Sequence, residues 1–486
     1  MATNLNGDRP ATTLMTRGGD ARLVLNPATG LNRYHSAPRP SNVLAYASST
    51  ANDISADAFD HVEHILARIA PDGTLSRPVY RDRLEQLRRR LRAAYGVPSG
   101  VAVVFAPSGT DLEYVALACT AGKADNGTHN VLLGADEVGS GCIYSASGQY
   151  FAQETALRVA TRPGDPVPGL GETSVEMIDV PVRGPDGRVR ASAEITKLVA
   201  EAVRHAEDAG RHPLVHVVHG SKTGLILPHL DDIDGLRRAH GDRLTFVVDA
   251  CQARITSAAI ADYLRRGAIV FLTGSKFMGG PPFSGFALVP PDIAARAPAL
   301  PSGFATIFRR VEWPAGWPGA EQLEDSANLG LLLRLEASLF DLERFQRLPA
   351  AAVMRVILSF HQAVRSEIVD RTPARRVAPY PPGAKETADT HPVEMRTLST
   401  LDLSGFGGAG FEDAGRWHRA LLAHGVRLGQ PVKCVKLPDG RWGATLRIGL
   451  TMAQIVERAD LDNAAIDAAF ASDMRRIADA LRAVAT

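Results

Sequence analysis

Short apolar segments alternate with helix-like segments through the middle of the chain. The strand candidates are VAVVF (101–105), VLLGA (130–134), VEMIDV (175–180), LVHVVHG (214–220), LTFVVDA (244–250) and AIVFLTG (268–274). Such runs are typical of strands that are buried on both faces of a parallel sheet. Because helical stretches lie between most of them, the pattern predicts a mostly parallel α/β sheet flanked by helices.

The two ends of the chain follow other patterns. Residues 1–50 are rich in Pro, Ser, Asn and Thr, which predicts an irregular arm that orders on the rest of the protein or on a partner subunit. Helical spacing of apolar residues follows at 54–70 and 80–95. Further along, 320–346 and 350–371 each predict one long helix.

The C-terminal third mixes strand candidates (MRTLSTLDL, ATLRIGL) with helical segments (FEDAGRWHRALLAH, 460–485), an α+β pattern. We therefore predict three regions. Residues 1–80 form the arm and the first helices, 81–315 form a large α/β domain, and 316–486 form a linking helix and a smaller α+β domain.

Composition excludes several classes of function. The 486 residues carry a formal charge of +1 without a basic stripe or an acidic tail, so we expect no nucleic-acid partner. The sequence has no run of about 18 apolar residues, so we expect no membrane span. The first residues are polar, so we expect no secretory signal. Cysteines without a CxxC pair indicate free thiols in a reducing, cytoplasmic compartment. The four cysteines are Cys119, Cys142, Cys251 and Cys434.

The strongest chemical signal lies at the ends of two neighbouring strand candidates. Asp249 ends one apolar strand and Lys276 lies just beyond the next. Ligands of open α/β sheets bind at the carboxyl ends of the strands, where these two side chains can meet one flat ligand. Pyridoxal 5'-phosphate (PLP) needs this pair, because a lysine holds its aldehyde and a carboxylate keeps its ring nitrogen protonated.

The segment 244–286 resembles fold-type I PLP-dependent enzymes, and within them the class V aminotransferase and cysteine desulfurase group. In that group one strand ends in Asp-Ala-x-Gln, and the next ends in a Ser/Thr-x-x-Lys turn followed by Gly and Pro. The matching residues are Asp249, Ala250, Gln252, Thr273, Ser275, Lys276, Gly279, Gly280 and Pro281.

The resemblance implies a role for each matched side chain. Lys276 would form the Schiff base with PLP, and Asp249 would pair with the pyridine nitrogen. Gln252 would approach the ring hydroxyl, while Thr273 and Ser275 would bind the phosphate.

A second phosphate contact is predicted where PSGTDLEYVAL (107–117) passes from a strand into a helix. A helix N-terminus with a glycine-containing turn binds anions readily. The resemblance assigns this role to Ser108, Gly109 and Thr110. Simple N-capping by Ser108 or Thr110 is the alternative.

Three further residues match the family in more distant segments. His219 begins HGSKTGLILP, which resembles a stretch beside the cofactor; a structural histidine is the alternative. Ser326 stands where the family has a Thr that reaches the phosphate of the neighbouring subunit. The match implies a homodimer with active sites at the interface. An ordinary N-cap is the alternative role for Ser326. Arg447 matches the Arg that binds the substrate carboxylate, which implies an α-amino acid substrate.

One position departs from the family pattern. Val138 occupies the place where a histidine commonly stacks on the pyridine ring. An aliphatic side chain or another residue must therefore cover the ring, so the exact subfamily stays open.

Other motifs carry weaker signals. GFGGAG (405–410) matches a dinucleotide-binding turn, but no acidic strand end follows, so a flexible loop is the better interpretation. Lys222-Thr223 resembles the end of a P-loop, but the preceding glycine spacing is wrong. We expect no metal site, because His212, His216 and His219 lack partner ligands with zinc-site spacing.

We predict PLP-dependent transformation of a small amino acid or amine, with an aminotransferase as the first hypothesis. In it the freed amine of Lys276 moves the Cα proton as a base and then as an acid. A lyase, desulfurase or decarboxylase stays open as the alternative, and a non-catalytic binding protein of the same fold is a third. Cys434 would be the mobile thiol of a desulfurase, although its alternating apolar neighbours favour a buried thiol. Residues such as Arg33, Tyr34 and His35 are candidates for the pocket lining.

Overall fold

The computed structural model describes residues 10–49, 51–139, 141–170, 175–380 and 391–485. Within these ranges the main sheet has eight strands in the order β2-β9-β8-β7-β5-β3-β4, with β6 beside β5. Neighbours among β4, β3, β5, β7 and β8 pair in parallel, whereas β9 is antiparallel to both β2 and β8. The strands are β2 (Ala102–Ala106), β3 (Thr128–Leu133), β4 (Glu176–Val180), β5 (His212–His219), β6 (Ile226–Leu227), β7 (Thr245–Asp249), β8 (Ile269–Thr273) and β9 (Gly285–Val289). The predicted mostly parallel sheet is confirmed.

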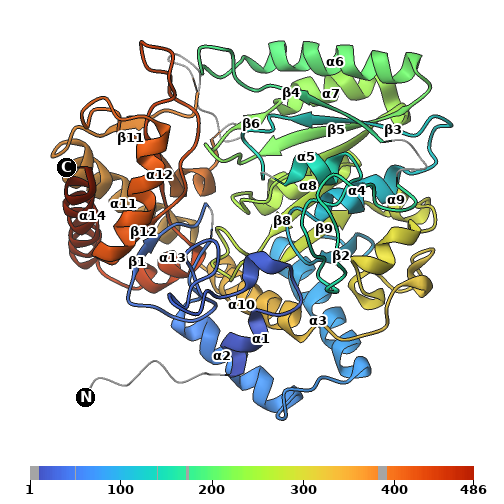
Figure 1. The fold of residues 1–486 in the computed structure, drawn as a ribbon, viewed down its shortest axis with the longest axis horizontal. Coiled ribbons are helices and arrows are strands. Elements are labelled where there is room, and N and C mark those ends of the chain that lie inside the picture. The colour runs from blue at the N-terminus through green and yellow to red at the C-terminus, as the bar shows by residue number, and fades with distance from the viewer. Residues whose placement is uncertain (1–9, 50, 140, 171–174, 381–390, 486) are drawn as a thin grey trace.

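The sheet is buried on both faces. Because successive side chains of a strand point to opposite faces, Val104 and Ala106 pack with α4 (Leu112–Thr120), while Val103 and Phe105 belong to a second cluster that includes α3 (Arg77–Tyr95). Helix α6 (Ser192–Asp208) joins that second cluster, and Figure 1 shows α6 and α7 (Leu230–His240) along the upper side of the sheet. This two-sided burial explains why the strand sequences are continuously apolar.

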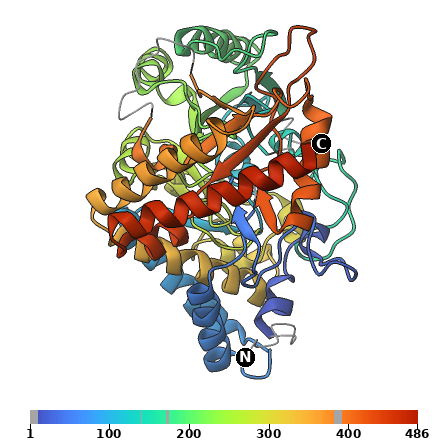
Figure 2. The same ribbon diagram turned by 90° about the vertical axis from the view of Figure 1, so that its left-hand side faces the viewer.

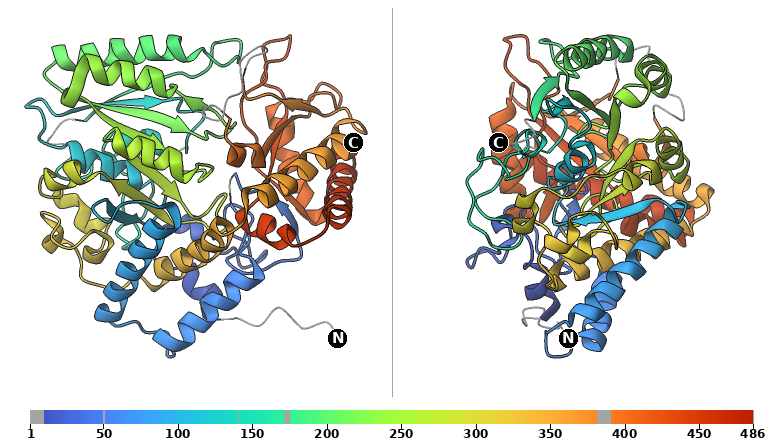
Figure 3. Two further views of the ribbon diagram at one scale, coloured as in Figure 1. Left: turned by 180° about the vertical axis from the view of Figure 1, so that it is seen from behind. Right: turned by 90° about the vertical axis from the view of Figure 1, so that its right-hand side faces the viewer.

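The C-terminal elements form an α+β unit on the other side of the molecule (Figure 1). Its antiparallel sheet has the order β10-β11-β13, and α14 crosses its outer side (Figure 2). Helix α10 packs against α1, α2, α3 and α13, and it lies between the two units in the view from behind (Figure 3). The elements are β10 (Arg375–Val377), β11 (Leu398–Asp402), β13 (Thr445–Gly449), α1 (Pro10–Met15), α2 (Ala56–Ile69), α10 (Leu329–Gln346), α11 (Ala350–Ala363), α12 (Phe411–Ala420), α13 (Met452–Ala459) and α14 (Asn463–Ala485).

Two predicted helices have different bounds in the structure. The helix expected over 320–346 begins only at Leu329, because Asn328 caps it by accepting a hydrogen bond from the Leu331 N–H at 3.0 Å. A short 3₁₀ turn, Ala320–Gln322, precedes the cap. The helix expected over 350–371 changes to a π-helical turn at Val364–Val369.

The N-terminal arm is held on the body of the same chain. Its strand β1 (Leu44–Tyr46) pairs in parallel with β12 (Val426–Leu428). The buried guanidinium of Arg334 in α10 donates to the carbonyl oxygens of Met15, Arg17 and Gly18, and also to that of Phe283 beside β9. Among the described residues, none of the helices combines the length and hydropathy that a membrane span requires.

Candidate functional site

A cavity of 240 Å³ lies at the carboxyl ends of the parallel strands. Asp249 is the last residue of β7, and Lys276 follows the last residue of β8 by three positions. Adjacent parallel strands bring both side chains to the same edge of the sheet, and both line the cavity. The predicted site residues in its wall are Ser108, Gly109, Thr110, Asp249, Gln252, Thr273, Ser275, Lys276 and Arg447.

The turn that carries Lys276 is fixed from two directions. From the arm, the buried Asn52 side chain donates to the carbonyl oxygens of Ser275 (3.1 Å) and Lys276 (2.5 Å). From α10, the hydroxyl of Ser338 approaches so closely that a Cβ on Gly274 would lie 2.1 Å from its Oγ. Only glycine fits at position 274, so the lysine turn and α10 can pack together.

The turn of residues 108–110 leads directly into α4, and its three residues line the cavity. The Ser108 hydroxyl donates to Asp111 Oδ2 at 2.6 Å. Burial raises the pKa of Asp111 to about 7, while the bond from Ser108 opposes this shift. A Cβ on Gly109 would lie 2.8 Å from Thr273 Cγ2, so the missing side chain lets the two turns approach each other closely.

Hydroxyl groups complete this end of the cavity. Thr273 Oγ1 donates to the carbonyl oxygen of Cys251 at 2.6 Å, and Ser275 Oγ donates to Thr273 Oγ1 at 3.3 Å. Hydroxyls, a helix N-terminus and a glycine without a Cβ form a donor set that fits a phosphate group. We name these residues (108–110, 273 and 275) the phosphate end.

Asp249 is oriented from its own turn and backed by a buried pair. Its Oδ1 accepts a hydrogen bond from the Cys251 N–H at 2.9 Å. Behind it, His216 Nε2 and Glu113 Oε2 lie 3.3 Å apart. Burial, with the nearby Asp249 charge, raises the pKa of Glu113, and burial lowers the pKa of His216 to about 4. Both shifts favour the uncharged forms of these two side chains.

A second group of lining residues contains Gln252 and Arg447. Gln252 Oε1 accepts a hydrogen bond from Arg254 at 2.8 Å, and Arg254 also bonds the Ser48 hydroxyl. Arg447 Nε donates to the Gln430 carbonyl oxygen at 2.9 Å. Burial lowers the pKa of Arg447 to about 10 and that of Arg254 to about 9. We name Gln252, Arg447 and their supports the substrate end.

Two predicted residues lie elsewhere. His219 is buried with its Nδ1 at 3.1 Å from the Tyr263 hydroxyl, and it is absent from the cavity wall formed by the described residues. Ser326 accepts a hydrogen bond from Arg309 Nε at 3.0 Å, outside this chain's cavity. Their predicted contacts with the cofactor and with the partner's phosphate stay predictions.

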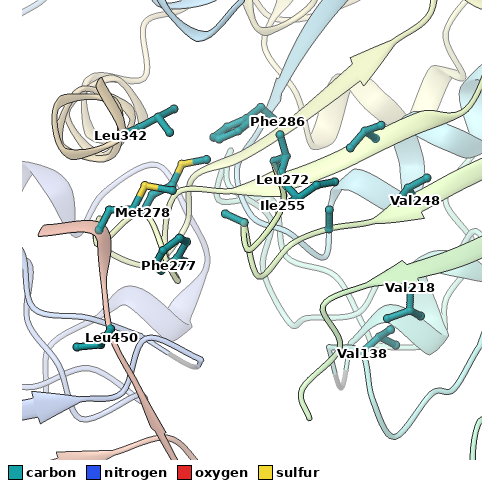
Figure 4. Packing of buried hydrophobic residues seen from close by; sticks show 14 of the residues in the cluster. Val138, Val218, Val248, Ile255, Leu272, Phe277, Met278, Phe286, Leu342 and Leu450 are labelled. Atoms are coloured by element: carbon teal, nitrogen blue, oxygen red, sulfur yellow. The ribbon is translucent and has the colours of Figure 1, made fainter. Parts of the chain in front are cut away.

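Other predictions about the cavity lining have mixed outcomes. Val138 is in the wall, and Figure 4 shows it beside Val218 of β5. Tyr34 also lines the cavity, whereas Arg33 is exposed and His35 lies against His418, with ring centroids 5.9 Å apart.

Sequence reasoning missed several lining residues, among them Lys222, Arg22, Phe283 and Cys142. Lys222 follows His219 by three positions and was visible beside the strand end, but its P-loop-like context carried no site signal. Arg22 and Phe283 reach the cavity through tertiary packing, and no local pattern marks them.

Neither a protein-family model nor a curated protein matches this sequence. Solved structures do match its fold. The cysteine desulfurase CsdA from Escherichia coli is 12% identical over 91% of this chain and 94% of its own, with a TM-score of 0.53. The cystine C-S lyase C-DES is 14% identical over 89% of this chain and 98% of its own, with a TM-score of 0.54.

A third similar structure is the ureidoglycine-glyoxylate aminotransferase from Bacillus subtilis. It is 13% identical over 92% of this chain and 98% of its own, with a TM-score of 0.53. These neighbours catalyse different reactions, so the likeness identifies the architecture and leaves the chemistry to the site. This chain has the fold of the fold-type I PLP-dependent enzymes.

Proposed function

We propose that this chain is a PLP-dependent enzyme that binds the cofactor covalently through Lys276 and transfers the amino group of an α-amino acid. The observation that carries the proposal is one cavity in which Lys276, Asp249 and the phosphate end meet. The similar folds of aminotransferases and lyases support it.

The residues fit PLP at each of its polar groups. The phosphate end would hold the phosphate, Asp249 would face the ring nitrogen, and Gln252 would lie near the ring hydroxyl. Val138 would supply an apolar surface for the ring in place of an aromatic side chain. When bound, PLP withdraws electrons from the substrate Cα and so makes its proton acidic.

The chain's own groups then direct the reaction. Arg447 would bind the α-carboxylate of the substrate and orient the Cα–H bond toward Lys276. The amine of Lys276, released when the substrate amine takes its place, would remove that proton and return it to a neighbouring carbon. The buried His219 would support the end of β5 behind the site, where its ring packs edge-on against Tyr263.

A desulfurase needs a thiol nucleophile, and the burial of the thiols argues against a desulfurase reaction. Cys434 is buried, and burial raises its pKa to about 12. Burial also raises the pKa of Cys142 and Cys251, which line the cavity. The thiolate is the reactive form, and the raised pKa values disfavour it. A reaction that needs no thiol, either transamination or elimination by a lyase, is therefore favoured.

Quaternary state and location belong to the same proposal. Ser326 lies outside this chain's cavity and would reach the phosphate of a partner subunit, so we propose a homodimer. Four free cysteines are consistent with a reducing cytoplasm.

The decisive experiment is the near-visible absorbance spectrum of the purified protein with PLP, before and after an amino-acid pool is added without keto acid. We expect a band that borohydride reduction makes irreversible. Lys276→Ala should remove the band and lower turnover about 10³-fold or more, whereas Lys197→Ala on α6 should keep both. A wild-type protein without the band would contradict the proposal.

The same experiment separates the reactions. Stoichiometric loss of the band with release of keto acid means transamination. Turnover with the band retained, and with release of sulfide, ammonia or carbon dioxide, means a lyase or decarboxylase.

A further inference from the structure

A second basic side chain lines the substrate end beside Arg447. Lys222 follows β5 and lies in the cavity wall, and its carbonyl oxygen is 3.4 Å from Arg447 Nη1. Its Nζ donates to the carbonyl oxygen of Asp136 at 2.9 Å, the one hydrogen bond that this ammonium makes within the described ranges. Since an ammonium has three donors, two stay available to a ligand.

The nearby carboxylate does not neutralise Lys222 directly. Glu137 also lines the cavity, but it accepts from Arg183 at 2.7 Å. It also accepts from the Ser221 hydroxyl at 2.7 Å and from the Thr223 N–H at 3.1 Å. These bonds occupy both carboxylate oxygens, so the Glu137–Arg183 pair is balanced within itself.

Near the phosphate end, the charge of Arg22 is likewise neutralised by a carboxylate, that of Asp20. Arg22 bonds both oxygens of Asp20, at 2.9 and 2.7 Å, and its guanidinium lies over the rings of Phe151 and Phe283. Arg22 acts electrostatically on Asp111, whereas Lys222 experiences the charges of Arg447, Glu137 and Lys276. Lys222 therefore belongs to the substrate end.

Lys222 and Arg447 together exceed what one α-carboxylate requires. A guanidinium binds a carboxylate with two parallel hydrogen bonds, which leaves the neighbouring ammonium without an anion. Two like charges in a half-buried wall repel each other, and a second anionic group would relieve that repulsion. The charge of the wall is therefore complementary to a substrate with two acidic groups.

We infer that the substrate is an amino acid whose side chain carries an acidic group, and that Lys222 binds that group while Arg447 binds the α-carboxylate. This inference rests on the proposed function, because it places the α-carboxylate at Arg447 next to PLP. It adds the substrate class, which the cofactor residues leave open.

The test measures binding of unreactive acids to the PLP-loaded protein by calorimetry. Glutarate carries two carboxylates, 3-phosphonopropionate exchanges one of them for a phosphonate, and butyrate carries one. We expect both diacids to bind about tenfold more tightly than butyrate. The tighter of the two diacids identifies the acidic group. Lys222→Gln should abolish the preference, Lys222→Arg should keep it, and the control Lys433→Gln, at an exposed position outside the cavity wall, should not change it.

The remaining outcomes would overturn the inference in distinguishable ways. If wild type with the lysine-linked PLP band binds diacids no more tightly than butyrate, the substrate class is wrong and the proposed function stands. If Lys222→Gln weakens butyrate as much as glutarate, Lys222 shares the α-carboxylate with Arg447. If no band forms with PLP, both proposals fail together.

Discussion

The two ends of the cavity are built in different ways. At the phosphate end, two short strand-to-turn segments supply every group, and each lies within a few residues of a strand of the main sheet. At the substrate end, Arg447 comes from β13 of the C-terminal unit, Ser49 from the arm and Lys222 from the loop after β5. The first end follows from local chain geometry, and the second requires three distant regions to pack together.

A buried arginine links these distant regions. Arg254 is fully buried and bonds Gln252, Ser48, Thr397 and the carbonyl oxygen of Leu450. A buried guanidinium is costly unless its donors are satisfied. The buried charge of Arg254 is therefore stable only while the arm and the C-terminal unit supply its hydrogen-bond acceptors. The geometry of the substrate end thus depends on the packing of these distant regions.

Arg447→Lys should break the substrate end and leave the phosphate end intact. Lysine keeps the charge but loses the fork that binds a carboxylate, so the dissociation constant of an amino-acid substrate should rise about 10- to 100-fold. Titration of substrate into the PLP-loaded variant measures this change. An equal loss of PLP affinity would mean that the two ends are not independent.

Gly109→Ala should break the phosphate end. The added Cβ would lie 2.8 Å from Thr273 Cγ2, so it would push apart the two turns that we assign to the phosphate. We expect the dissociation constant of PLP to rise about tenfold, measured by equilibrium titration of the apoprotein. Gly235→Ala in α7 meets only a distant atom of Arg238 and is the matched control. Unchanged PLP affinity in Gly109→Ala would place the phosphate elsewhere.

His219→Gln tests whether the buried His219, at the end of β5, has a structural role. Burial lowers the pKa of His219 from 6.5 to about 3. Below pH 6.5 the unfolded chain therefore binds a proton that the folded protein excludes, and stability falls as the pH falls. The loss is about 1.4 kcal/mol per pH unit at most.

Glutamine can keep the contact with Tyr263 but cannot take up a proton. The difference in free energy of unfolding between wild type and variant should therefore shift in favour of the variant between pH 6.5 and 5, as urea denaturation would show. His64→Gln, at an exposed position in α2, is the control. A pH-independent difference would mean that His219 is not a buried neutral histidine.

The sequence by itself determined most strands of the main sheet, the sheet class and the positions of Asp249 and Lys276 at the ends of neighbouring strands. Continuous apolar runs predict buried parallel strands, and parallel strands bring their carboxyl ends to one edge, so local patterns suffice for the phosphate end. Only the tertiary structure decided that the helix begins at Leu329, that His219 faces Tyr263, and that Lys222 joins Arg447 in the wall. These features depend on caps, burial and contacts between segments far apart in the chain, which no local pattern of polar and apolar residues encodes.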